Sequence, residues 1–199
     1  MNRYFLFATT LMVAVAGCQK SKTKTESASS QSDQTKIVAC SLITNDEVQK
    51  IQGSPVKDTK PSESADSSFR FSQCFYSTEV FNKSVSLAVT QRNPDSASGR
   101  DPKTFWKETF GRYEGEMKER EGDEEKKKSL TEEDEERGTP PKKIEGIGDD
   151  AWWTASRMGG ALYVLKNNVF IRVSVGGPAT QESMIEKTKA LAAKALSRL

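Results

Sequence analysis

Adjacent carboxylates at Asp149 and Asp150 are the residues of this sequence that come closest to a catalytic or metal-binding pair. Two neighbouring carboxylates can bind a divalent cation or serve as the acid and base of a hydrolase. Adjacent residues in an extended chain point in opposite directions, however, and such aspartates commonly form turns. The sequence has no histidine, which removes the commonest general base and most catalytic zinc sites. We therefore predict no catalytic residues, no metal site and no cofactor, and we rank a hydrolase with paired carboxylates last.

Trp152 and Trp153 are the best candidates for a binding surface. Adjacent positions on a strand face opposite sides of a sheet, so burial of one indole in the core leaves the other at least partly exposed. Arg157 and Arg172 would supply positive charge beside an exposed ring. The alternative is that a neighbouring helix or the tail covers the second ring, and the sequence does not decide between the two.

The first residues have the pattern of an export signal. Arg3 precedes an apolar stretch from Tyr4 to Ala16, which has the length of a signal peptide and is shorter than the roughly 20 residues that span a bilayer. The segment Val15-Ala16-Gly17-Cys18 then resembles the lipobox of bacterial lipoproteins, in which the peptide is cut before the cysteine and the cysteine is acylated. We expect residues 1–17 to be removed and Cys18 to anchor the protein in a membrane of the bacterial envelope.

By analogy with other lipoproteins, Gln19 after this cysteine favours the outer membrane. Residues 18–36 contain no large apolar side chain and are expected to form a flexible linker with a reach of roughly 23 Å.

Two further cysteines, Cys40 and Cys74, remain in the exported part of the chain. In an oxidising compartment they are expected to pair, because their spacing is not that of a redox motif and no histidine could complete a zinc site. On the chain-entropy model the disulfide would stabilise the fold by ~3–4 kcal/mol.

Charge does not indicate a nucleic-acid partner. The net charge is +2, and basic residues alternate with acidic ones instead of gathering into a basic stripe. The expected partners are the membrane, through the lipid anchor, and an envelope protein or small molecule whose identity the sequence does not reveal.

One short helix is signalled clearly. Thr44 and Glu47 have the spacing of a capping box, and Gly53 followed by Pro55 ends the pattern. These residues predict a helix over 44–52.

Strands are expected next. Aromatic residues predict strands at 69–71 and 74–76, and alternating apolar and polar residues predict a strand over 85–90. The Ser-, Asp- and Pro-rich stretch over 57–68 is typical of a loop.

A second helix is predicted after Asp101-Pro102, an N-cap followed by proline in the first turn. Aromatic and apolar residues then recur at helical spacing, namely Trp106, Phe110, Tyr113 and Met117, and this stripe is expected to pack on the sheet as core. The charged stretch 118–143 is expected to be a partly mobile insertion.

The C-terminal part predicts an antiparallel meander and a helix. Segments 151–156, 162–166 and 169–175 are joined by Gly159-Gly160 and Asn167-Asn168, which suit tight hairpin turns. An amphipathic helix is predicted from about Thr180.

Together these elements predict one α+β domain over 37–199. It consists of a mostly antiparallel sheet of about five to six strands, helices on one face, and the Cys40–Cys74 disulfide.

Several segments together resemble a group of uncharacterised bacterial lipoproteins and exported domains. They are Ala39–Thr44 with Glu47, Gln73–Tyr76, Gly146–Trp152 and Gly160–Val164. The resemblance implies a capped helix tied by a disulfide to an early strand and implies no particular reaction. We therefore expect a membrane-anchored, non-enzymatic binding or interaction module. The alternative is a small-molecule carrier or ligand-sensing domain, which needs an apolar cavity between the sheet and the helices.

Overall fold

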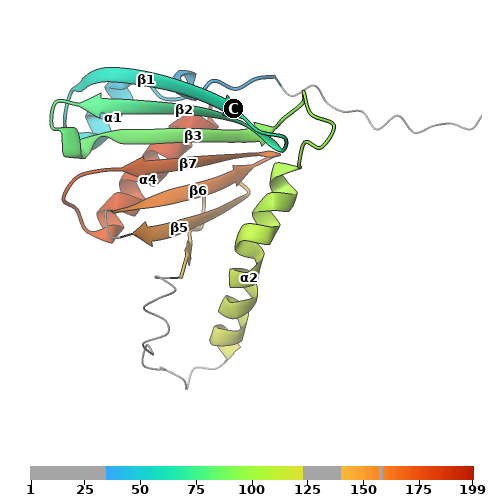
Figure 1. Ribbon diagram of the computed structural model, residues 1–199. Coiled ribbons are helices and arrows are strands. Elements are labelled where there is room, and N and C mark those ends of the chain that lie inside the picture. Colours follow the sequence, from blue (N-terminus) through green and yellow to red (C-terminus); the bar gives the residue numbers. More distant parts are fainter. Residues whose placement is uncertain (1–34, 123–139, 157–158) are drawn as a thin grey trace, which may run out of the picture. The chain divides into compact units, whose positions relative to one another are not determined.

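An antiparallel sheet of seven strands organises the residues that the computed structural model describes, which are 35–122, 140–156 and 159–199 (Figure 1). The strand order is β1-β2-β3-β7-β6-β5-β4. The strands are β1 (Val56–Ala65), β2 (Phe69–Thr78), β3 (Val85–Arg92), β4 (Lys142–Lys143), β5 (Asp150–Ser156), β6 (Gly159–Lys166) and β7 (Val169–Val175). The helices are α1 (Asn45–Gln52), α2 (Pro102–Gly122) and α4 (Gln181–Leu196), with short 3-10 turns at Ala39–Ser41 and Phe81–Lys83.

The predicted α+β class with a mostly antiparallel sheet and one disulfide is confirmed, with seven strands instead of five to six. The predicted signal peptide 1–17, the predicted lipidation site Cys18 and most of the predicted linker and of the charged insertion lie outside the described residues. Among the described helices, none has the length and apolar composition needed to cross a membrane.

The prediction of a loop over 57–68 is wrong, because most of this stretch forms β1. Nearly every residue of β1 is exposed, so the strand has no alternation of apolar and polar residues from which it could be recognised. Its place at the sheet edge explains this composition. Pro61, which cannot donate to a ladder, is tolerated where only one side of the strand is paired, and Lys57 and Lys60 discourage pairing with another chain.

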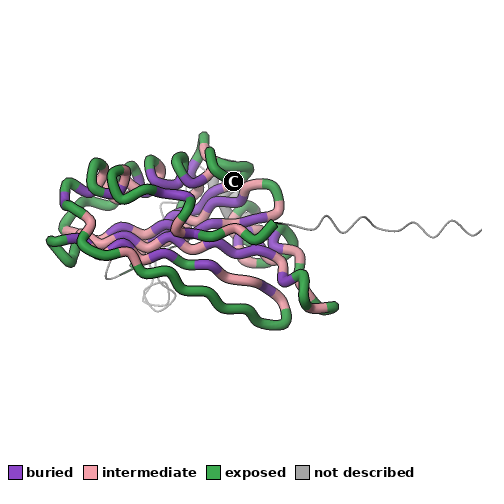
Figure 2. The backbone as a smooth tube through the Cα atoms, turned by 90° about the horizontal axis from the view of Figure 1, so that it is seen from above, coloured by how far each residue is buried: buried purple, intermediate pink, exposed green. Residues whose placement is uncertain are grey.

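The main core lies between the sheet and the pair α1 and α4 (Figure 1). Alternate residues of β3 and β7 point into it, and Leu191 and Ala195 of α4 belong to the same core. Figure 2 shows that the buried residues follow the strands. The members of this core with the largest fully buried side chains are Trp153, Tyr76, Leu42, Ile43, Leu87, Leu162, Ile171 and Leu191.

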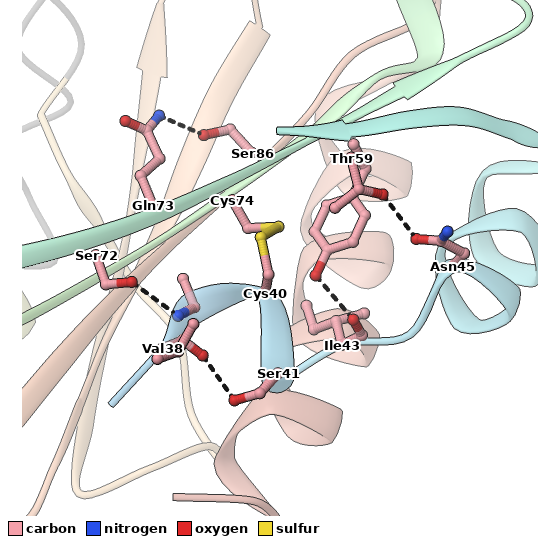
Figure 3. Close-up of a disulfide and its surroundings, with 12 residues drawn as sticks. Val38, Cys40, Ser41, Ile43, Asn45, Thr59, Ser72, Gln73, Cys74 and Ser86 are labelled. Carbon is pink, nitrogen blue, oxygen red and sulfur yellow. Dashed lines mark hydrogen bonds between the residues drawn. A yellow bond between two sulfur atoms is a disulfide. The ribbon is translucent and has the colours of Figure 1, made fainter. Parts of the chain in front are cut away.

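The chain enters this core through the predicted disulfide, which joins Cys40 to Cys74 of β2 (Figure 3). The backbone N–H of Ala39 donates to Ser72 Oγ (2.9 Å), and the Tyr76 hydroxyl donates to the Ile43 carbonyl (2.8 Å). Burial raises the pKa of Tyr76 to about 12. These contacts fix the segment before α1 against β2, and α1 itself begins with the predicted Thr44–Glu47 capping box.

Helix α2 lies on the opposite face of the sheet from α1 and α4, so the helices cover both faces and not one. The helix begins as predicted, with Asp101 accepting a hydrogen bond from the Thr104 N–H (2.9 Å). Its residues Trp106, Phe110 and Tyr113 pack on Trp152, Tyr163, Leu165 and Phe170 in a second, smaller hydrophobic cluster. The side chain of Met117 lies outside the described part of the structure.

An ion pair joins the end of the chain to the start of α1. Both terminal nitrogens of Arg198 contact the carboxylate of Glu47 (2.8 and 2.9 Å), and the guanidinium also donates to the Leu42 carbonyl (2.7 Å). The hydrogen bond from Arg198, followed by that from the Thr44 backbone, lowers the pKa of Glu47 from 4.5 to about 2. The last turn of α4 is thereby held against α1.

We predict that the stability of the domain depends on the charge of Glu47. Because the folded pKa lies below the unfolded one, the contribution is fully present above 4.5 and is lost as the pH falls toward about 2. Glu47→Gln can still accept the Thr44 N–H but lacks the charge, so it should be less stable than the wild type at neutral pH and equally stable near the bottom of this window. Urea unfolding of both proteins across the window measures the difference, and a constant difference would refute the assignment.

Candidate functional site: an aromatic cleft beside helix α2

The carboxylate of Asp150 holds α2 on the sheet. Its Oδ2 accepts the indole N–H of Trp106 from α2 (2.8 Å) and that of Trp152 from its own strand (3.3 Å). Its Oδ1 forms an ion pair with Nζ of Lys143, at a distance of 2.5 Å. One carboxylate therefore links β4, β5 and α2.

Lys143 completes this network. Its ammonium also contacts Glu114 of α2 (3.2 Å) and lies 4.8 Å from the centre of the Trp152 ring, within cation–π distance. Burial opposes its charged form, but hydrogen bonds to Asp150 and Glu114 outweigh burial and raise the pKa of Lys143. The side chain thus stays charged and fixes β4 to the helix.

Aromatic rings fill the contact between α2 and the sheet. The Phe110 ring stacks on Trp152 with centroids 5.8 Å apart and an angle of 5°, and its centroid is 5.7 Å from that of Tyr163. Trp106 lies 4.6 Å from Phe110 and 6.0 Å from Phe170. Each ring packs against other rings, which reduces the conformational entropy that these side chains would lose when a ligand binds.

These rings leave a cavity of about 310 Å³, which we call the aromatic cleft. Six aromatic side chains line it, and its remaining walls come from Thr109, Arg112, Pro141 and Thr154. The six are Phe105, Trp106, Phe110, Tyr113, Tyr163 and Phe170.

A second, more polar cavity of about 410 Å³ adjoins the aromatic cleft, and we call it the polar hollow. Thr154 and Tyr163 line both cavities. Arg172 lies in the polar hollow opposite Tyr163 in the β6–β7 ladder, and its Nε donates to the Tyr163 hydroxyl (3.2 Å). The two cavities therefore meet at Tyr163 and Thr154.

The expectation that one indole of the Trp152–Trp153 pair is exposed is wrong. Trp152 is 0 % exposed and Trp153 1 % exposed. The rings do leave the strand on opposite faces, as alternation requires, but α2 covers Trp152 while the main core takes Trp153. The alternative that a helix covers the second ring is the one the structure shows. Of the two predicted arginines, Arg172 lies in the polar hollow, and Arg157 lies outside the described residues.

Asp149 and Asp150 each have separate structural partners. Asp149 accepts hydrogen bonds from Lys166 Nζ (3.0 Å) and the Asn167 N–H (2.6 Å), which lower its pKa. Asp150 is engaged by Trp106 and Lys143, so neither carboxylate is directed into the aromatic cleft or the polar hollow. Over the described ranges, no three Cys, Asp or Glu residues gather into a candidate metal site.

Sequence reasoning missed Tyr163, Thr154 and Phe170 as site residues. A signal for Tyr163 was available, because a two-residue turn at Asn167-Asn168 sets Lys166 opposite Val169 and therefore Tyr163 opposite the predicted Arg172. No such signal exists for the space between α2 and the sheet, because the aromatic stripe of α2 is equally compatible with a filled core.

Comparisons with known proteins leave the family open. No family model and no curated protein matches the chain. One solved structure that the chain resembles is described as a GTP binding regulator from Thermotoga maritima; the match has 14 % identity, covers 77 % of this chain and 87 % of that chain, and has a TM-score of 0.38. A likeness of this size carries no argument about function, and the resemblance to bacterial lipoproteins stays a prediction.

We predict that Trp152→Ala and Trp153→Ala each lower the free energy of unfolding by ~3–5 kcal/mol, because each ring fills a closed part of a core. Phe81→Ala is the control: that ring is 72 % exposed, and its removal should cost within about 0.5 kcal/mol. Urea denaturation measures all three variants. A small loss at Trp152 would mean that α2 does not cover the ring in solution.

Proposed function

We propose that this chain is a lipid-anchored, non-enzymatic binding protein of the bacterial envelope that takes a small molecule with an apolar body into the aromatic cleft. The observation that carries the proposal is the cleft of about 310 Å³ with six aromatic side chains in its wall. Small-molecule sites are concave, mostly apolar and about 300–1,000 Å³ in volume, so the cleft has the size for a compact ligand.

The placing of the cleft supports binding. A small-molecule carrier needs an apolar cavity between the sheet and a helix, and the aromatic cleft lies between α2 and strands β5 to β7. Its walls belong to a helix and strands held together by the Asp150 and Lys143 network, so they do not have to be ordered when a ligand enters.

The chemistry of the walls favours binding over catalysis. Among the described residues that line it, the aromatic cleft has hydroxyl groups and one arginine but no carboxylate, cysteine or lysine. The two candidate carboxylates, Asp149 and Asp150, are occupied by structural partners. A hydrolase with paired carboxylates is therefore not part of the proposal.

The anchor part of the proposal rests on the sequence pattern around Cys18. The described part of the linker enters the domain at Gln91, whose amide accepts the Ile37 N–H (2.9 Å) and donates to the Thr35 carbonyl (3.0 Å). The residues between Cys18 and Thr35 would thus connect the domain to the membrane. We propose that this is the outer membrane.

The binding part is tested with N-phenyl-1-naphthylamine, an uncharged aromatic probe that fluoresces in apolar surroundings. The wild type should give a saturable signal. Thr154→Phe places a phenyl ring where the two cavities meet and should weaken binding about tenfold or more, because this ring takes up volume that the probe would otherwise fill.

Ser64→Phe, which adds the same ring on exposed β1, is the matched control and should bind like the wild type. Unchanged binding by a folded Thr154→Phe, or the absence of saturable binding to the wild type, would refute this part of the proposal.

The anchor part is tested separately in bacterial cells that express the full chain. A clickable fatty-acid analogue should label the wild type, and Cys18→Ser should lose both the label and membrane association, because acyl chains contribute about 0.8 kcal/mol per buried CH₂ group. Cys40→Ser, which keeps Cys18, should keep the label. Equal labelling of the wild type and Cys18→Ser would contradict lipidation at this residue.

A further inference from the structure

The walls of the aromatic cleft and the polar hollow carry charge of only one sign. Among the described lining residues the charged side chains are Arg112 and Arg172, and none is Asp or Glu. This contrasts with the rest of the chain, in which acidic and basic residues are nearly balanced. A ligand that fits both cavities should therefore carry negative charge at one end and an apolar or aromatic group at the other.

Arg172 is the better placed of the two arginines to meet a ligand. It lies in the middle of β7, half-buried, between Tyr163 of β6 and Ala88 of β3 in the strand register. Alanine is small, so the side chain of this neighbour cannot extend over the guanidinium. Arg112, by contrast, is exposed and lies 4.6 Å from the ring of its neighbour Tyr113, at the outer rim of the aromatic cleft.

The hydrogen bond between Arg172 and Tyr163 places the guanidinium and the tyrosine O–H side by side, so that both can donate to the same ligand atom. Arg172 uses its Nε to donate to the Tyr163 hydroxyl, and within the described residues its terminal nitrogens make no ion pair or hydrogen bond. A hydroxyl that accepts a hydrogen bond still has its own proton to donate. The guanidinium and the tyrosine O–H can therefore both donate to an oxyanion placed at this junction.

We propose that the ligand is an amphipathic organic anion, with an oxyanion held by Arg172 and Tyr163 and an apolar or aromatic body in the aromatic cleft. The inference rests on the proposed binding function and names the chemical class of its ligand. Tyr163 and Thr154 line both cavities, so one molecule can contact the rings and the guanidinium at the same time. Charge-assisted hydrogen bonds of a half-buried arginine are stronger than those of an exposed one.

The test compares two probes that share their rings. 8-Anilinonaphthalene-1-sulfonate is N-phenyl-1-naphthylamine with a sulfonate added, so the pair isolates the contribution of the anion. Arg172→Gln should weaken binding of the sulfonate about tenfold or more and change binding of the neutral probe by about twofold or less.

Tyr163→Phe, which keeps the ring, should weaken sulfonate binding by a smaller factor and spare the neutral probe. Arg70→Gln removes a guanidinium that pairs with Asp95 outside both cavities, and it should bind both probes like the wild type.

The outcomes separate this inference from the proposed function. Saturable binding of the neutral probe with sulfonate affinity unaffected by Arg172→Gln and Tyr163→Phe would overturn the anion site and leave the binding function in place. Equal losses of affinity for both probes in Arg172→Gln would also overturn the anion site, because Arg172 would then act only by supporting the structure of the cleft. If neither probe binds the wild type, both proposals fail. Should Arg172→Gln not fold, as judged by near-ultraviolet circular dichroism, Tyr163→Phe decides the question.

Discussion

Trp152 and Trp153 follow one another on β5, so their rings leave the sheet on opposite faces, and both are removed from water. Each ring needs apolar cover on its own side. The main core with α4 provides it for Trp153, and α2 provides it for Trp152. The two-sided layering of the domain therefore follows from this pair, and so does the aromatic cleft, which exists only because a helix is packed over the second face.

Burial of Trp152 brings a polar requirement with it. An indole N–H away from water needs an acceptor, and Asp150 supplies one oxygen to both Trp152 and Trp106. A half-buried carboxylate is itself costly unless compensated, and Lys143 provides the compensating charge. Trp153 has no such partner for its indole nitrogen within the described residues. The network of Asp150 and Lys143 therefore lies on the α2 face, where it fixes the helix to β4 and β5.

The two faces of the sheet differ accordingly in chemistry. The face toward α1 and α4 is closed by mostly aliphatic side chains, together with Trp153, Tyr76 and a disulfide, and has the character of an ordinary core. The face toward α2 combines stacked rings, a guanidinium on β7 and small residues such as Ala88 and Ser174 beside it. A helix that covers only part of a sheet leaves a concave space beside it. Here that space extends to Arg172, the half-buried arginine of β7.

Local and periodic features of the fold could be predicted from the sequence, because they depend on neighbours along the chain. The capping box at Thr44, the start of α2 at Asp101, the β5–β7 meander and the Cys40–Cys74 pair all belong to this class. Strand β1 could not be recognised, because an edge strand exposed on both faces has no hydrophobic alternation.

The sequence by itself determined that Trp152 and Trp153 face opposite ways, since alternation is a property of any strand. Only the tertiary structure decided that α2 crosses to the second face, buries Trp152 and leaves a cleft ending at Tyr163 and Arg172. The physical reason is that a cavity is the volume left between elements distant in sequence. That volume depends on the sum of many packing contacts, whereas the pattern of any one element reports only which of its sides is apolar.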